Sequence, residues 1–280
     1  MSSKVGEPTT RYYFRFSLFF RLLHVLLMTT FVGLAATGMP LRFNQARWAN
    51  DVAHAMGGFG AILFFHRTFA VLMTVCFALH IGHVLIAALA ERRPGMFWGP
   101  TSMIPQPRDL VDMFLHFRWF FGLGPRPRFD RFTYWEKFDY WAVFWGMAII
   151  GTSGYMLWFS GFFARFLPGR VFNVALLLHS EEALLAVWFI FAIHFFNNHL
   201  RPGKFPLDLV IFTGRVTEEE LREERPDELE RLEREGGLEA IRADAPPLWL
   251  RNLGRIVGFT VIVIGFLLFG LTVLASLKPQ

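Results

Sequence analysis

Residues 68–90 read TFAVLMTVCFALHIGHVLIAALA, a run of 23 positions without Asp, Glu, Lys or Arg. A helix of about 20 apolar residues crosses the hydrocarbon core of a bilayer. This stretch is therefore long enough to span a membrane, and it is too apolar for a helix on the surface of a soluble domain.

Four more uncharged runs follow the same pattern, at 22–41, 140–164, 183–200 and 256–277. The whole chain of 280 residues is 54% hydrophobic and 18% charged, with a single cysteine, Cys76. These numbers exclude a soluble enzyme, a nucleic-acid-binding module and a disulfide-linked scaffold. They predict an all-α, polytopic membrane protein. We expect a four-helix transmembrane domain in 1–200, a cytoplasmic charged helical loop in 201–252, and a fifth transmembrane helix with a short external tail in 253–280.

The distribution of basic residues predicts the orientation. Residues up to Arg21, the loop 91–137 and the region 199–255 together carry 22 of the 28 Lys and Arg residues. The alternate side carries the other 6. Because basic residues favour the cytoplasmic side, we expect five crossings, a cytoplasmic N-terminus and an external C-terminus.

Two polar segments between the runs have helical signals. Residues 108–121, RDLVDMFLHFRWFF, alternate charged and apolar side chains at helical spacing and predict an amphipathic helix on the cytoplasmic membrane surface. In 217–244, Thr217 and Glu220 form a capping-box pattern, and Pro226 precedes a second short helix. This segment is interpreted as a solvated helical hairpin or, alternatively, a docking surface.

Histidines are concentrated in the apolar runs or at their edges. Those histidines are His24, His66, His80, His83, His179 and His194. Ionisable residues within a membrane usually serve a function, and imidazole binds iron, copper, zinc and nickel. No C-x-x-C-H motif for covalent haem is present. Pairs of imidazoles from different helices would suit the iron of haem b.

Helix geometry indicates which histidines pair. His179 and His194 are 15 residues apart, about 22 Å along an α-helix and about 60° around it. The predicted topology places His66 at the depth of His179, and His24 at the depth of His194. We therefore predict two haem groups, with His66 and His179 as the iron ligands of one and His24 and His194 as those of the other.

Two alternatives remain open. His80 lies 14 residues after His66 and is about 40° from it around the helix, so His80 could replace His24 as a ligand. A third haem could use His80 or His83 together with His199. For His80 and His83, helix packing or quinone contact is the simpler interpretation.

Polar residues at both ends of the fourth helix are candidates for quinone contact. Asn197, Asn198, His199 and Arg201 follow His194, and Glu181 and Glu182 follow His179. Amide, imidazole and guanidinium groups can hydrogen-bond quinone oxygens, and a carboxylate can accept a proton. Alternatively, Arg201 anchors the interface or pairs with a haem propionate, and the two glutamates face water.

Three stretches resemble one family. These are RLLHVLLMTTFVGLAATGMP (21–40), EKFDYWAVFWGMAIIGTSGYMLWF (136–159) and LLHSEEALLAVWFIFAIHFF (177–196). They are similar to the first, third and fourth helices of the di-haem cytochrome b subunits of membrane formate dehydrogenases and nickel-iron hydrogenases. The resemblance covers about residues 11–200 and implies haem ligation by His24 with His194 and by His66 with His179. The pair His80/His83, the insertion after the fourth helix and the fifth helix depart from that family.

These observations predict a b-type cytochrome subunit embedded in the lipid of a bacterial inner membrane. We expect it to bind no nucleic acid. It would serve as the electron-transfer subunit of a quinone-linked oxidoreductase complex. Electrons would pass between a quinone pool and an external multihaem cytochrome c, iron-sulfur protein or catalytic subunit. The competing hypothesis is a haem-free transporter or channel in which the histidines form a proton path.

Overall fold

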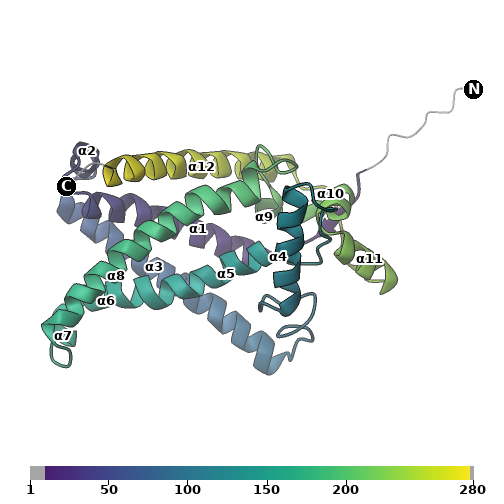
Figure 1. The fold of residues 1–280 in the computed structure, drawn as a ribbon, viewed down its shortest axis with the longest axis horizontal. Helices are drawn as coiled ribbons and strands as arrows, with labels where there is room; N and C mark the ends of the chain where they lie inside the picture. The colour runs from purple at the N-terminus through teal and green to yellow at the C-terminus, as the bar shows by residue number, and fades with distance from the viewer. Residues whose placement is uncertain (1–9, 278–280) are drawn as a thin grey trace, which may run out of the picture. The chain divides into compact units, whose positions relative to one another are not determined.

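The computed structural model describes residues 10–277, most of them helical. Four helices are long and apolar enough to cross a membrane, namely Leu18–Arg42, Phe59–Ala90, Gly169–Leu200 and Leu248–Ser276 (Figure 1). The first and last are α1 (Leu18–Arg42) and α12 (Leu248–Ser276). The second joins α3 (Phe59–Leu85) to the π segment η1 (Ile86–Ala90). The third joins α8 (Gly169–Trp188) to the π segments η3 (Phe189–His194) and η4 (Phe196–Leu200). The expected class, an all-α, multi-pass membrane protein, is confirmed.

The run at 140–164 is helical but is not among these four. It belongs to α5 (Tyr134–Gly146), the π segment η2 (Met147–Gly151) and α6 (Thr152–Trp158), followed by α7 (Ser160–Phe163). Its Trp, Tyr, Gly, Ser and Thr residues lower its mean hydropathy. Four of the five expected crossings are thus supported, and the crossing at 140–164 stays a prediction. The segments 1–9 and 278–280, which enter the charge count, lie outside the described residues.

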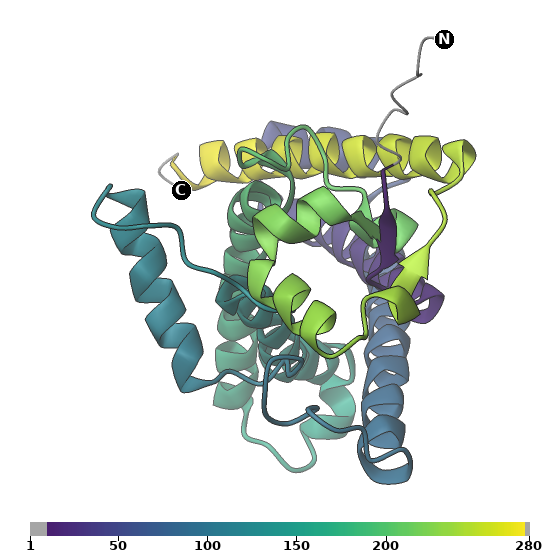
Figure 2. The same cartoon turned by 90° about the vertical axis from the view of Figure 1, so that its right-hand side faces the viewer.

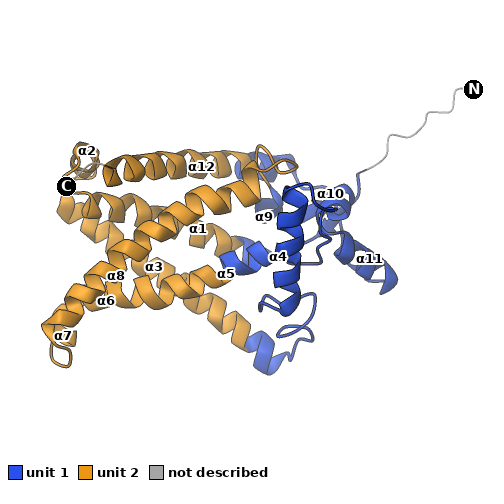
Figure 3. Cartoon of the chain, viewed as in Figure 1, with its two compact units in different colours: residues 1–21, 86–140, 209–254 blue, residues 22–85, 141–208, 255–280 orange. Residues whose placement is uncertain are grey.

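The chain forms two compact units (Figure 3). The described part of unit 1 comprises 10–21, 86–140 and 209–254, and that of unit 2 comprises 22–85, 141–208 and 255–277. This division cuts across the one expected from the sequence, because the N-terminal segment and the loop 86–140 join the charged loop in one unit. The reason lies in the strand pairing and ion pairs of unit 1.

Unit 2 is held together by α1, α8 and α12. Its core cluster consists of Ala35 and Met39 from α1, Phe43 just after α1, Leu184, Val187, Phe191 and Phe195 from the helix that starts with α8, and Ile262 and Leu268 from α12. Glycines allow helices of this unit to approach one another closely. A Cβ on Gly33 would lie 2.6 Å from the ring of Phe69, and one on Gly265 would lie 2.6 Å from that of Phe195.

A small sheet organises unit 1. Strands β1 (Tyr12–Phe14), β2 (Arg215–Thr217) and β3 (Arg242–Ala243) pair antiparallel in the order β2-β1-β3. Figure 2 shows β1, the purple arrow, among the green elements of residues 209–243. Sequence patterns had not indicated this sheet, because strands of two or three residues have no detectable periodicity.

The remaining elements of unit 1 include the expected helices. The amphipathic segment forms α4 (Pro107–Phe120), and the charged segment forms α10 (Glu218–Glu224) and α11 (Pro226–Arg234). Thr217 and Glu220 make the predicted capping box. The short elements elsewhere in the chain are α2 (Arg47–Ala55), α9 (Val210–Thr213) and the 3-10 helix η5 (Glu239–Ile241).

Buried ion pairs join the three segments of unit 1. Glu228, 1% exposed, binds Arg15 at 2.7 Å and Arg131 at 2.8 Å. Arg225 binds Glu136 at 2.7 Å. The helices at 217–244 are therefore not a fully solvated hairpin, since one face contributes buried charges that hold 10–21 and 126–137 in place.

We expect Glu228→Gln to destabilise the fold. Removing this charge leaves two guanidiniums without their shared partner, and breaking a buried ion pair in this way costs about 3–5 kcal/mol. The exposed pair Glu239–Arg242 provides the control, because Glu239→Gln removes a surface charge worth at most about 1 kcal/mol. Unfolding by denaturant in detergent measures both variants. Equal stability of the two would contradict the structural role of Glu228.

The same network predicts a pH dependence. Burial by itself would raise the pKa of Glu136, but Arg225, Arg15 and hydrogen bonds from Thr133 hold that pKa below its usual value of 4.5. A carboxyl with a lowered pKa stabilises the fold above about pH 4.5, and this contribution is lost as the pH falls towards the lowered pKa. Glu136→Gln should therefore reduce the loss of stability that occurs as the pH falls below about 4.5. Glu219→Gln, at an exposed position, should leave the wild-type slope unchanged, and an unchanged slope in Glu136→Gln would refute the prediction.

Candidate functional site

His66 and His179 face each other inside unit 2. His66 comes from α3 and His179 from α8. Their ring centroids are 6.2 Å apart and their planes are nearly perpendicular, at 85°. The structure therefore brings together the two histidines that were predicted to share one depth.

Hydrogen bonds at Nδ1 fix the tautomer of both rings. The Thr37 hydroxyl donates to the carbonyl of Gly33 at 2.6 Å, so its oxygen accepts from Nδ1 of His66 at 2.9 Å. Nδ1 of His179 donates to the carbonyl of Ile150 at 2.9 Å. With the proton assigned to Nδ1 in this way, Nε2 of each neutral ring keeps its lone pair. Metal-binding histidines are oriented by the same kind of outer hydrogen bond.

Two glycines make room for these imidazoles. A Cβ on Gly38 would lie 3.0 Å from Cε1 of His66, and a Cβ on Gly154 would lie 2.8 Å from Cε1 of His179. Each ring thus rests against a helix backbone where a side chain would displace it.

The separation of the rings suits two ligands of one metal ion. On each side, a metal–imidazole bond of about 2.0 Å and about 1.1 Å from nitrogen to ring centre place the two ring centres about 6.2 Å apart. The 6.2 Å between His66 and His179 matches this sum. The separation of the two ring centres is therefore compatible with a single metal ion bound by both imidazoles.

A second histidine cluster, made of His24, His194 and His199, lies at the other end of α8 and its π segments. His194 and His199 have ring centroids 6.4 Å apart, and His24 is in electrostatic range of both. In a regular α-helix residues five apart differ by about 140°, whereas the i→i+5 bonding of η3 and η4 brings them onto neighbouring turns. The sequence does not indicate that His194 and His199 lie close together, because π-helical hydrogen bonding has no recognisable sequence pattern.

The hydrogen bonds of this second cluster differ from those of the first. Within residues 10–277, Nδ1 of His24 and Nδ1 of His199 are buried without a hydrogen-bond partner. The Asn198 amide lies 3.1 Å from Nδ1 of His194 and donates to the His194 carbonyl at 3.0 Å. His24 and His194, the expected pair, are within electrostatic range of each other, and His199 belongs to the same cluster.

The other expected site residues make contacts of their own. His80 lies edge-on to Phe144 at 6.1 Å, and His83 follows in the last turn of α3. Glu181 forms an ion pair with Arg42 at 2.9 Å, and Glu182 accepts from the Trp145 indole at 3.3 Å. Arg201 donates to the carbonyl of Asn197 at 2.7 Å. These contacts give both glutamates structural partners.

Sequence reasoning missed the residues that orient the imidazoles. Thr37 and the carbonyl of Ile150 hold the rings, and the Ser153 hydroxyl lies 3.4 Å from Nδ1 of His179. The sequence does contain one signal for these residues. A hydroxyl residue directly precedes each of the two glycines that contact the imidazoles, which we call the cradle glycines, in Thr37-Gly38 and Ser153-Gly154. A carbonyl in a π segment leaves no mark in the sequence.

Comparison with known proteins adds no relative, since neither a protein-family model nor a curated protein matches this chain. The geometry of the two histidine clusters is therefore the basis on which a function can be assigned.

We expect Gly154→Ala to destabilise unit 2, because its Cβ would lie 2.8 Å from His179 and overpacking of this kind costs about 1–3 kcal/mol. Gly161→Ala is the matched control, because a Cβ there meets no atom of the described structure within 4 Å. Thermal unfolding in detergent should show a lower melting temperature for Gly154→Ala alone. Equal melting temperatures for both variants and the wild type would refute close packing of His179 against Gly154.

Proposed function

We propose that this chain is a membrane-integral b-type cytochrome that transfers electrons between a quinone pool and a partner redox subunit. The observation that carries the proposal is the pair His66–His179, with centroids 6.2 Å apart and both Nδ1 atoms hydrogen-bonded. Metal and haem sites typically contain histidine ligands whose other ring nitrogen donates its N–H to a hydrogen-bond acceptor in the protein.

The residues present fit haem b. His66 and His179 would hold one haem, and Gly38 and Gly154 let their rings lie against α1 and α6. His24, together with His194 as first choice and His199 as the alternative, would hold the second. When bound, haem supplies one-electron redox chemistry. The chain's own contribution is to fix the Nε2 lone pairs and to surround the site with an apolar core.

We place quinone contact at the second cluster. Glu181 is held by Arg42, and Glu182 by Trp145, so the end of the helix near His179 offers fewer unengaged polar groups.

At the opposite end, His199 has a buried Nδ1 without a hydrogen-bond partner in the described chain. That nitrogen could exchange a proton with a quinone oxygen, while Asn198 holds His194 and Arg201 caps the helix at Asn197.

The distribution of basic residues supports an orientation in the membrane. It fits an N-terminus in the cytoplasm of a bacterium, and we propose an external multihaem cytochrome c or iron-sulfur subunit as the partner. Such a chain acts as the electron-transfer subunit of a quinone-linked oxidoreductase. Lipid surrounds the spans.

Absorbance spectra of dithionite-reduced variants test the proposal. His66→Ala and His179→Ala should each lose about half of the haem b α-band, because each removes one ligand of one of two haems. His80→Ala, whose ring packs on Phe144, should retain the full band. His66→Met provides a second measurement, because His/Met coordination should raise the reduction potential of that haem.

Two results would count against the proposal. Wild-type protein without haem absorbance would favour the proton-path alternative, in which the three clustered imidazoles of His24, His194 and His199 relay protons. An equal loss of the α-band in His80→Ala and His66→Ala would contradict the assignment of ligands.

A further inference from the structure

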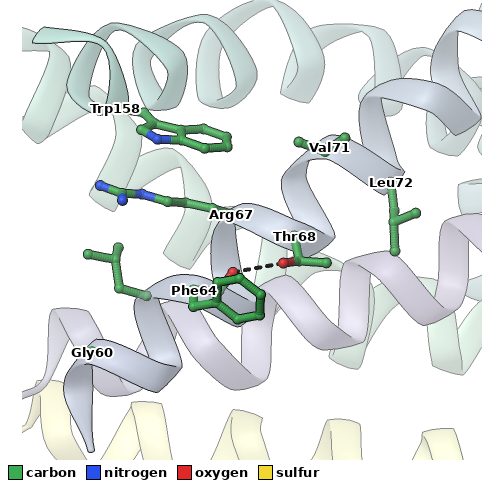
Figure 4. Close-up of a pocket in the computed structure, with 8 residues that line it drawn as sticks. Gly60, Phe64, Arg67, Thr68, Val71, Leu72 and Trp158 are labelled. Carbon is green, nitrogen blue, oxygen red and sulfur yellow. Dashed lines mark hydrogen bonds between the residues drawn. The ribbon is translucent and has the colours of Figure 1, made fainter.

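Arg67 carries a positive charge into a groove on the surface of unit 2. The groove has a volume of about 460 Å³. Its lining residues are Gly60, Leu63, Phe64, Arg67, Thr68, Val71, Leu72 and Trp158 (Figure 4). All but Trp158 belong to α3, and the lining contains a single charged side chain. The groove therefore combines apolar walls with one cation.

No carboxylate in the described part of the chain neutralises this cation. Arg67 makes no ion pair with any carboxylate among residues 10–277. Its guanidinium lies 5.2 Å from the ring centre of Trp158 (Figure 4), and the Thr68 hydroxyl is used by the carbonyl of Phe64 at 2.9 Å. Since a charge inside a membrane span is costly unless it is paired or reaches the interface, an anion from outside the chain would stabilise Arg67.

The position of Arg67 along its span matches the level of lipid headgroups. The helix Phe59–Ala90 has 32 residues, about 48 Å in length, and the hydrocarbon core is about 30 Å thick. A centred helix therefore extends about 9 Å beyond each boundary. Arg67 lies about 12 Å from the start of the helix, which is only about 3 Å inside the boundary.

We propose that this groove binds one anionic phospholipid, with its phosphate on Arg67 and an acyl chain along Leu63, Phe64 and Val71. The chemistry favours this occupant over a quinone, since the lining holds no carboxylate or imidazole to exchange a proton. It also favours lipid over a haem propionate. Arg67 follows His66 by one residue and so points about 100° away from it around the helix. The proposal does not depend on whether haem is bound.

Native mass spectrometry of the full chain, delipidated in detergent, tests the proposal with dioleoyl phosphatidylglycerol as the probe. We expect the wild type to retain one molecule, and to retain dioleoyl phosphatidylcholine much less. Arg67→Gln should bind phosphatidylglycerol about tenfold more weakly, because a charge-assisted contact to phosphate is lost. Arg67→Lys should keep most of the binding.

Arg170→Gln is the matched control, because it removes an exposed arginine of unit 2 outside the groove and should bind like the wild type. The proposal is overturned if Arg67→Gln retains phosphatidylglycerol as well as Arg170→Gln does. Displacement of the lipid by a short-chain quinone would overturn it in favour of a quinone site. Loss of haem in Arg67→Gln would overturn it in favour of propionate pairing.

Discussion

The hydrogen bond at Nδ1 of each paired histidine is the interaction on which the account of unit 2 depends. A polar group in an apolar bundle must find a partner within the protein. Thr37 and the carbonyl of Ile150 meet this need for His66 and His179. The same bonds leave the Nε2 lone pair of each neutral ring free of a proton, and the two ring centres lie 6.2 Å apart. The cradle glycines and the π segment η2 are the local adjustments that allow this arrangement.

The two units satisfy their polar groups in different ways. Unit 2 buries few charges and uses threonine, serine and backbone carbonyls as partners for its histidines. Unit 1 buries guanidiniums and carboxylates together, as in Arg15–Glu228–Arg131 and Arg225–Glu136. Buried ion pairs are costly to break, so they fix the relative positions of three segments that are distant in the sequence.

Much of this could be predicted from the sequence, for physical reasons. Uncharged runs gave four supported spans, helix geometry paired His66 with His179, and Thr217 with Glu220 marked a helix start. The sheet of β1, β2 and β3 could not be predicted. Tyr12 pairs with Thr217, and these residues are so far apart in the sequence that no local pattern indicates their pairing. The proximity of His199 to His194 could not be predicted either. It depends on the π segments, where backbone hydrogen bonding and not composition sets the angle between successive side chains around the helix.

The central claim is that paired histidines hold haem b at two levels of unit 2. Haem stoichiometry per polypeptide, measured as the pyridine haemochrome on purified wild-type protein, tests this most directly. We expect two b-type haems for each chain, one at His66 and His179 and one at the cluster containing His24. Protein that binds no haem even after incubation with excess haem, or that binds three haems per chain, would contradict this assignment.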